Sequence, residues 1–348
     1  MGNGEDCMNN CKKGIAVAGN MLVDMLYPIH GFPKPGELVT ITGELSRSTG
    51  GCVCNDIIDL AALDPMLPLT AVGRVGHDEA GEFVLNKMRP WKNVNLDQVK
   101  KEGTTSFTLV MADEISKQRS FYQCRGANAA FCESDIDWEN LNAEILHIGY
   151  ILLLDALDEP DDRYGTKMAR LLHTAQEKGI KTSIDVVTEA GDRFQRIVTP
   201  ALKYTDYCII NESEAQNVTG VKLVNEAGKP IFENMQAALK RMKALGVSSW
   251  AVIHCPEGGF GLDENDQYVE IPGVKLPHDY IKGSVGAGDA FCAGVLYGAW
   301  KGMTLAESIE MGTAAAVCSL SEPGATEGMR SAEETMQQYR KLKGIKEP

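Results

Sequence analysis

Apolar runs bounded by Gly, Pro, Asn and Asp recur along the chain and alternate with stretches of helical periodicity. A buried strand of a parallel sheet is apolar on both faces, whereas a helix repeats its apolar positions every three to four residues. The alternation predicts an α/β fold with a mostly parallel central sheet and helices on both faces. The expected strands are 14–18, 69–72, 145–148, 182–186, 207–210 and 250–254, and the expected helices are 51–63, 77–88, 162–177, 287–300 and 305–319.

The first third of the chain also contains two stretches in which polar and apolar residues alternate, with many β-branched side chains. A period of two is typical of strands with one buried face. We therefore expect residues 38–43 and 105–123 to form strands of a separate small antiparallel sheet. Such a sheet beside an α/β domain has the arrangement of a lid; the alternative is a pair of surface hairpins without function.

Length and composition indicate a globular protein and exclude one class of function. The chain has 348 residues, of which 44% are hydrophobic and 24% charged, enough for one large core. The net charge is −14, and Lys and Arg form only short pairs, such as 100–101 and 340–341. Because a phosphate backbone is bound by clustered basic residues, we expect no nucleic-acid partner.

The 10 cysteines and the polar N-terminus indicate a protein of a reducing compartment that is not anchored in a membrane. The closest cysteine pairs are Cys7 with Cys11 and Cys52 with Cys54, and neither has the partner pair of a zinc motif. The N-terminus lacks the apolar core of a signal peptide, and no apolar run reaches the length of a membrane span. The sequence predicts a cytoplasmic protein with reduced thiols and no membrane partner.

Residues 286–289, Gly-Ala-Gly-Asp, precede an apolar helix and carry the strongest chemical signal. The start of a helix offers unpaired N–H groups and a partial positive charge, and small residues let an anion approach closely. The pattern predicts an anion hole at Gly286, Ala287 and Gly288, with Asp289 as a base that accepts a proton. Phosphoryl transfer to a hydroxyl needs this combination; the alternative is an ordinary capped helix.

Two further groups of polar residues have the character of a binding site. Gly50 and Gly51 precede a predicted helix whose first turns carry Asn55, and an amide side chain suits a polyhydroxylated ligand. Asn20 and Asp24 follow the first strand at the carboxyl end of the sheet, where open α/β sheets bind ligands. The alternatives are a helix start whose glycines serve packing and a solvated turn.

Asn211 and Glu214 follow the strand 207–210 and would share one face of a helix. Their oxygen atoms suit Mg²⁺, held through water. The same segment also matches an N-x-x-E capping box, and both interpretations can hold together. A phosphate-binding P-loop, the G-x-G-x-x-G fingerprint of dinucleotide-binding enzymes and a G-x-S-x-G elbow are all absent from the sequence.

Taken in order, these segments resemble the ribokinase-like (PfkB-type) sugar and nucleoside kinases over about residues 14–330. The segment 286–289 fits the core of the family's D-T-x-G-A-G-D signature, and Gly50-Gly51 with Asn55 fits its N-terminal signature. Further matches are 73–78 to G-x-V-G-x-D, 211–214 to N-x-x-E, and 321–325 to the late G-A segment beside the nucleotide.

The resemblance implies a three-layer α/β/α domain over 14–330, with a small β-sheet lid at about 36–44 and 105–125 that mediates a homodimer. Residues 1–13 and 342–348 would be flexible tails. ATP and Mg²⁺ would be the cofactors. Besides Asp289 and the anion hole, it implies acceptor binding by Asn20, Asp24, Gly50, Gly51, Asn55 and Arg119, metal or phosphate binding by Asn211 and Glu214, and nucleotide binding by Ser284, Gly259, Gly324 and Ala325.

Two departures from the family pattern affect what the resemblance implies. Gly283-Ser284 stands where the family has Asp-Thr, and that Asp belongs to a monovalent-cation loop. Its absence argues against activation by K⁺. Pro256 lies in the segment 254–259, where the family has T-L-G-x-x-G, and it removes a backbone N–H from the nucleotide loop.

The leading hypothesis is an ATP-dependent kinase that phosphorylates a hydroxyl, expected to be a hydroxymethyl group, of a small sugar. A nucleoside kinase of the same fold is the first alternative, because the lid region offers Phe107, Phe121, Tyr122 and Phe131 for stacking on a base. A non-catalytic sugar-binding relative is the second.

Overall fold

Strand β1 (Gly14–Gly19) lies inside a nine-stranded sheet and is buried along its whole length. The computed structural model describes residues 13–116, 118–189, 191–277 and 279–344. Most of the two predicted tails, and the pair Cys7 and Cys11, lie outside the described residues. Among the helices described, none combines the length and the apolar character needed to cross a membrane.

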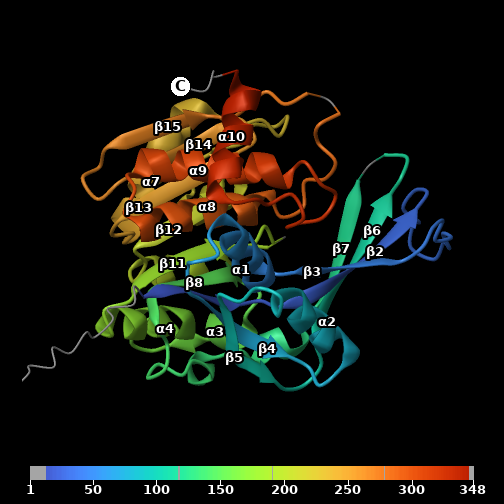
Figure 1. Ribbon diagram of the computed structural model, residues 1–348, viewed down its shortest axis with the longest axis horizontal. Helices are drawn as coiled ribbons and strands as arrows, with labels where there is room; N and C mark the ends of the chain where they lie inside the picture. Colours follow the sequence, from blue (N-terminus) through green and yellow to red (C-terminus); the bar gives the residue numbers. More distant parts are fainter. Residues whose placement is uncertain (1–12, 117, 190, 278, 345–348) are drawn as a thin grey trace, which may run out of the picture.

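The central sheet has the order β15-β14-β13-β12-β11-β8-β1-β4-β5. All neighbours from β13 to β5 pair in parallel, and the antiparallel pairs of this sheet are β13 with β14 and β14 with β15 (Figure 1). This confirms the predicted mostly parallel sheet. The remaining strands are β15 (Tyr268–Pro272), β14 (Gly258–Leu262), β13 (Trp250–Cys255), β12 (Tyr207–Asn211), β11 (Lys181–Val186), β8 (Ala143–Ile151), β4 (Leu69–Val75) and β5 (Val94–Lys101).

Successive residues of β1 feed two hydrophobic cores, one on each face of the sheet. Ala16 and Ala18 belong to one core, and Ile15 and Val17 belong to the other. Because strand side chains alternate between faces, a strand buried on both sides must be apolar throughout. This is why the continuous apolar runs of the sequence predicted these strands.

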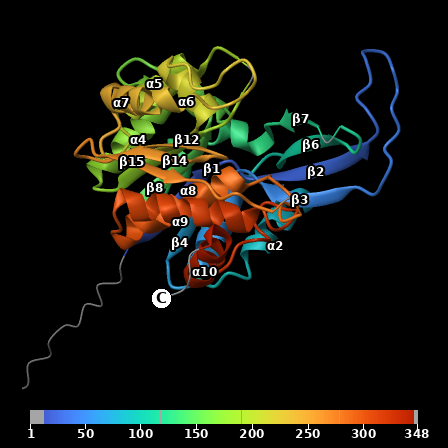
Figure 2. The same ribbon diagram turned by 90° about the horizontal axis from the view of Figure 1, so that it is seen from above.

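Helices cover both faces of the sheet, which gives the predicted three layers. In Figure 2, α4 to α7 lie on one side and α8 to α10 on the other. The helices are α1 (Cys52–Leu63), α2 (Glu79–Met88), α3 (Asp155–Asp158), α4 (Lys167–Glu177), α5 (Phe194–Leu202), α6 (Glu212–Thr219), α7 (Met235–Leu245), α8 (Ala287–Lys301), α9 (Leu305–Ser319) and α10 (Ala332–Lys343). Helix α10 lies beyond the expected domain limit at residue 330 and fully buries Tyr339.

Two predicted helices begin later in the structure than in the prediction. Helix α2 starts after Asp78, whose side chain accepts a hydrogen bond from the Gly81 N–H and caps the helix. Helix α4 starts after Thr166, because residues 160–166 form the small hairpin of β9 (Pro160–Asp161) and β10 (Gly165–Thr166) instead. In both cases a capping side chain ends the preceding extended segment.

A four-stranded sheet, here called the lid sheet, projects from the body at one end (Figure 1). Its order is β3-β2-β6-β7, with bounds β3 (Ser46–Gly50), β2 (Leu22–Ile29), β6 (Ser106–Asp113) and β7 (Arg119–Cys124). Strands β6 and β7 confirm the prediction for 105–123. The sheet is mixed rather than antiparallel, because β2 pairs in parallel with β6.

The prediction of a strand at 38–43 is wrong, and the strand of this region is β3. Within 38–43 only Ile41 makes a bridge, to Ile29. Leu38 is 90% exposed and Ile41 47% exposed, so the alternating pattern buries nothing there. Strand β2, which the sequence analysis did not identify, begins three residues after β1 ends. The lid sheet therefore continues directly from the central sheet.

Candidate active site

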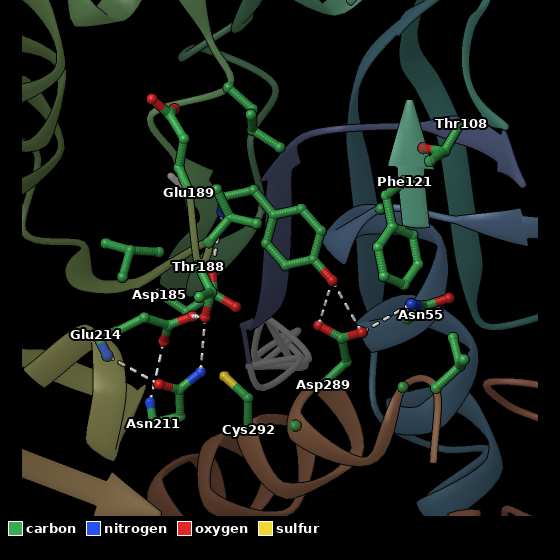
Figure 3. A pocket seen from close by; sticks show the side chains of 18 of the residues that line it. Asn55, Thr108, Phe121, Asp185, Thr188, Glu189, Asn211, Glu214, Asp289 and Cys292 are labelled. Atoms are coloured by element: carbon green, nitrogen blue, oxygen red, sulfur yellow. Dashed lines mark hydrogen bonds between the residues drawn. The ribbon is translucent and has the colours of Figure 1, made fainter. Parts of the chain in front are cut away.

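A cavity of about 620 Å³ opens between the lid sheet and the carboxyl ends of the central strands. The lid sheet contributes Asp24, Thr108 and Phe121, and the start of α8 contributes Gly286, Gly288 and Asp289. Figure 3 shows Asp289 and Cys292 on the same helix, with Asn211, Glu214 and Asp185 across the cavity from the lid residues. Chain segments far apart in sequence thus form one concave site.

Asp289 is held by two side chains from different elements. Asn55 Nδ2 donates to Asp289 Oδ2 over 2.7 Å. The Tyr150 hydroxyl lies 2.9 Å from Oδ1 and 3.0 Å from Oδ2. Burial raises the pKa of Asp289, and the hydrogen bonds from Asn55 and Tyr150 oppose that rise. The result is an oriented carboxylate whose proton affinity is higher than that of a solvated Asp.

The backbone at the start of α8 leaves its amides available. Gly286 caps the helix with φ of 79°, a left-handed conformation that favours glycine. Within the described ranges, no group accepts a hydrogen bond from the N–H of Gly286, Ala287 or Gly288. A Cβ on Gly286 would lie 2.6 Å from the Ala325 Cβ, so the turn is also packed closely. The assignment of these amides as an anion hole remains a prediction.

The predicted acceptor-binding residues divide into two groups. Asp24, Gly51 and Asn55 line the cavity. Burial raises the pKa of Asp24, a hydrogen bond from Thr108 lowers it, and burial prevails, so that the pKa is about 6. The cavity lining among the described residues does not include Asn20, Gly50 or Arg119, and their assignment remains a prediction.

The structure shows where the three residues outside the cavity lining, Asn20, Gly50 and Arg119, lie. Asn20 is buried, donates to the Tyr150 carbonyl over 3.4 Å and accepts from Asn128. Gly50 packs against Asp24, because a Cβ there would collide with the Asp24 carboxylate. Arg119 is exposed at the start of β7. Asn20 and Gly50 therefore support their cavity neighbours from behind.

Asn211 and Glu214 form a capping box at the start of α6. Asn211 Oδ1 accepts from the Glu214 N–H over 2.9 Å, and Glu214 Oε2 accepts from the Asn211 N–H over 3.0 Å. Glu214 Oε1 accepts from the Thr188 hydroxyl over 3.0 Å. Burial raises the pKa of Glu214 to about 7. The capping interpretation is confirmed, and both side chains also line the cavity.

A second cavity of about 500 Å³ lies on the other side of the α8 start. It is lined by Ser284 and Ala287, and it shares Asn211, His254 and Gly288 with the first cavity. The two cavities therefore meet at the start of α8.

Three residues predicted to bind the nucleotide are absent from the described lining of the second cavity. Gly259 lies in β14 beneath α9, where a Cβ would lie 2.5 Å from Ile309. The Ala325 carbonyl accepts from the Ser319 hydroxyl over 3.1 Å, and Ala325 packs on Gly286. Gly324 precedes it in the same loop. Their assignment to the nucleotide remains a prediction.

The sequence analysis missed Tyr150, which completes the environment of Asp289. Tyr150 lies at the carboxyl end of β8 with φ of 62°, and its N–H donates to Asp185 Oδ1 over 2.7 Å. Left-handed conformations of non-glycine residues concentrate at functional sites. The rule that ligands bind at the carboxyl ends of strands, applied to the strand predicted at 145–148, would have found it.

Arg125 was also missed and is the sole Lys or Arg among the described residues that line the first cavity. It lies just after β7, donates to the Leu152 carbonyl over 2.8 Å and pairs with Asp155. Glu189 lies 3.7 Å away. No local pattern marks this residue, because its partners come from elsewhere in the chain.

Comparison with known proteins places these features in a family. The model of the family described as pfkB family carbohydrate kinase matches residues 12–332. A ribokinase of Haemophilus influenzae is 23% identical over 336 residues, which cover 94% of this chain and 98% of that protein. A bifunctional ribokinase/ribose-5-phosphate isomerase A of Fructilactobacillus sanfranciscensis is 25% identical over 216 residues, or 62% of this chain, but the match spans only 37% of that longer protein.

A solved structure supports the fold although its sequence identity to this chain is low. The structure of Arabidopsis thaliana ribokinase complexed with ribose and ATP aligns with a TM-score of 0.76 at 22% identity, over 94% of this chain and 99% of that chain. The predicted ribokinase-like fold is confirmed.

Proposed function

Since the chain belongs to the pfkB family of carbohydrate kinases, we propose that it transfers the γ-phosphoryl group of ATP to a hydroxyl of a small sugar, with Asp289 as the general base. One observation carries the proposal: two cavities meet at the start of α8. Asp289 faces the first cavity, Ser284 and Ala287 line the second, and Gly288 lines both. A sugar in the first and ATP in the second would meet at these amides.

In the proposed reaction, the sugar hydroxyl gives its proton to Asp289 as its oxygen bonds to the γ-phosphorus. The bond between that phosphorus and the bridging oxygen of ADP breaks. The N–H groups of residues 286–288 would receive the negative charge of the transferring group. Asn55 and Tyr150 hold the carboxylate in place, so no reorientation is needed when the hydroxyl arrives.

Mg²⁺ would neutralise charge on the ATP phosphates, and the oxygens of Asn211 and Glu214 fit a hydrated ion. Each already accepts a hydrogen bond within the capping box. A water bound to the ion can reach the second lone pair of these oxygens and leave the box intact. In our proposal these two residues would hold the ion through water, and Asn211 lines both cavities.

The lining of the first cavity favours a sugar over a nucleoside. Asp24 and Asn55 present a carboxylate and an amide to the ligand, which suit several hydroxyl groups. Of the four aromatic residues considered for stacking on a base, only Phe121 lines the cavity, and Phe131 is fully buried. The relatives named ribokinase, deoxyribokinase and fructokinase also point to a pentose or hexose.

Activation by K⁺ is not part of the proposal. A Cβ at Gly283 would lie 2.5 Å from the Pro323 carbonyl oxygen. An Asp at this position would therefore require the 323 segment to move, and the local packing suits the glycine found here.

The test is Asp289→Asn in an assay of ADP release against a panel of sugars and nucleosides, with and without K⁺. Without the base, we expect turnover of the preferred sugar to fall about 10²- to 10⁴-fold, while ATP binding stays near wild type. Asp97→Asn, at an exposed position of β5, is the matched control and should retain full activity.

Near-normal turnover by the Asp289→Asn variant would overturn the mechanism. A wild-type protein that phosphorylates nucleosides in preference to every sugar would support the first alternative. Calorimetry that shows sugar binding without ATP consumption would support a non-catalytic relative.

A further inference from the structure

Beneath the floor of the first cavity, three metal-ligating side chains converge from α1, β8 and α8. They are Asp56, His147 and Cys292, with exposed fractions of 0%, 0% and 2%. One donor atom from each lies within 4.8 Å of the other two. The proposed kinase reaction uses none of the three, and nothing in the sequence spacing marks them as a set.

Two of the three distances between these donor atoms are close to those around one tetrahedral ion, and the third pair lies within 4.8 Å. His147 Nε2 lies 3.2 Å from Asp56 Oδ2 and 3.9 Å from Cys292 Sγ. Zinc bonds of about 2.0–2.3 Å at tetrahedral angles place neighbouring ligand atoms roughly 3.3–3.6 Å apart. Adjustments of a few tenths of an ångström would give ideal coordination for these two pairs.

The second ring nitrogen of His147 is arranged as in a metal-bound histidine. Its Nδ1 lies 2.9 Å from the Ser183 hydroxyl, which can hold the proton of that nitrogen. Metal ligands of this type fix their other ring N–H on a neighbouring acceptor. With its proton on Nδ1, the ring leaves Nε2 unprotonated and able to bind a metal.

The carboxylate of Asp56 is buried without a hydrogen bond. Both of its oxygens lack a partner within the described residues, and the 3.2 Å approach of His147 does not have hydrogen-bond alignment. The neighbouring Asp59 is equally unpartnered and fully buried. Buried carboxylates are neutralised by a proton, a cationic partner or a metal. Within ion-pair distance of Asp56, His147 is the sole basic group among the residues described.

We propose that Asp56, His147 and Cys292 form a buried site for one divalent transition-metal ion, with Zn²⁺ as the best match. A thiolate, an imidazole and a carboxylate in tetrahedral spacing are typical zinc ligands. Cys292 also lines the first cavity, which provides the entry path and a water for the fourth position. The ion would join α1, β8 and α8 directly below Asp289, and this inference is independent of the proposed kinase activity.

The binding test uses the wild-type full chain, stripped with a chelator and titrated with Zn²⁺ against a chromophoric competitor. We expect one Zn²⁺ per chain with a dissociation constant below about 1 µM. Co²⁺ in its place should give a thiolate-to-cobalt charge-transfer absorption typical of a tetrahedral site. Failure to bind Zn²⁺ in this range, or a Co²⁺ spectrum without the thiolate band, overturns the proposal.

Substitutions of the proposed ligands, compared with substitutions of other cysteines, test where the ion binds. Cys292→Ala and His147→Gln should each lose the stoichiometric Zn²⁺ and the cobalt–thiolate band. The double variant Cys7→Ser/Cys11→Ser and the buried Cys208→Ser should keep both. Retention of Zn²⁺ by Cys292→Ala, or its loss from Cys7→Ser/Cys11→Ser, contradicts the assignment. If the buried substitutions prevent folding, the wild-type cobalt spectrum decides.

Discussion

At the residue scale, Tyr150 links the backbone of the site to its proposed base. Its φ of 62° costs about 1–3 kcal/mol for a non-glycine residue, and its N–H bond to Asp185 helps to hold that conformation. In return, the hydroxyl reaches both oxygens of Asp289. Asn55 binds only Oδ2, so Tyr150 is the main side-chain constraint on Oδ1.

Replacing Tyr150 with Phe removes this donor and keeps the ring. The hydrogen bond from Tyr150 lowers the pKa of Asp289, so its loss raises that pKa. A base is active when deprotonated, and the acidic limb of the pH profile of kcat/KM should therefore move to higher pH. We also expect kcat to fall about 10- to 150-fold, since a charge-assisted hydrogen bond contributes roughly 1.5–3 kcal/mol.

The control for this substitution is Tyr268→Phe on the edge strand β15, whose hydroxyl lies 3.3 Å from Glu270. It should leave the profile unchanged. An acidic limb of Tyr150→Phe that stays in place or moves to lower pH would show that the hydroxyl does not tune Asp289.

At the element scale, the start of α6 serves both stability and the site. The capping box and the Thr188 contact surround Glu214 with donors, and only 5% of Glu214 is exposed. Burial nevertheless raises its pKa from 4.5 to about 7. Folding thus favours the protonated form, and the stability that this provides is complete below pH 4.5 and is lost as pH rises through about 7.

Glu214→Gln keeps the shape of the box and removes the titration. The free energy of unfolding of the wild type should fall between pH 4.5 and 8, relative to this variant, by up to about 3 kcal/mol at about 1.4 kcal/mol per pH unit. Denaturant unfolding at both pH values, without ATP or Mg²⁺, measures the difference. Equal pH dependence of the two proteins would contradict the raised pKa.

Some elements of this protein could be predicted from the sequence, and others could not. Strands such as 207–210 were found because they are buried on both faces and are therefore continuous apolar runs. The segment 286–289 was found because its small residues and its Asp are consecutive in the sequence. The strand expected at 38–43 failed because alternation alone does not say whether a core lies beneath it. Tyr150 and Arg125 acquire their roles from partners more than 20 residues away, such as Asp289 and Leu152, and only the tertiary fold brings those partners together.

At the scale of the whole molecule, the lid sheet has two different faces. Asp24, Thr108 and Phe121 line the cavity from one face. Because strand residues alternate, their neighbours point the other way. Met25 pairs with Leu109, and Leu109 pairs with Tyr122, so an apolar row crosses three strands on the far face. Tyr122 is 59% exposed and Leu109 and Met25 are half-buried, so the row keeps apolar surface in contact with solvent.

A second copy of the chain, packed lid against lid, would cover this row, and we expect a homodimer whose interface includes Leu109 and Tyr122. Leu109→Glu should then give a monomer by sedimentation velocity and should raise KM for the sugar, because the cavity face of the same sheet loses its support. Met66→Glu alters an equally apolar side chain, 81% exposed on the turn after α1, and should stay dimeric. A wild-type protein that sediments as a monomer at every concentration would show that the row is simply exposed, since an interface of this kind must assemble by mass action.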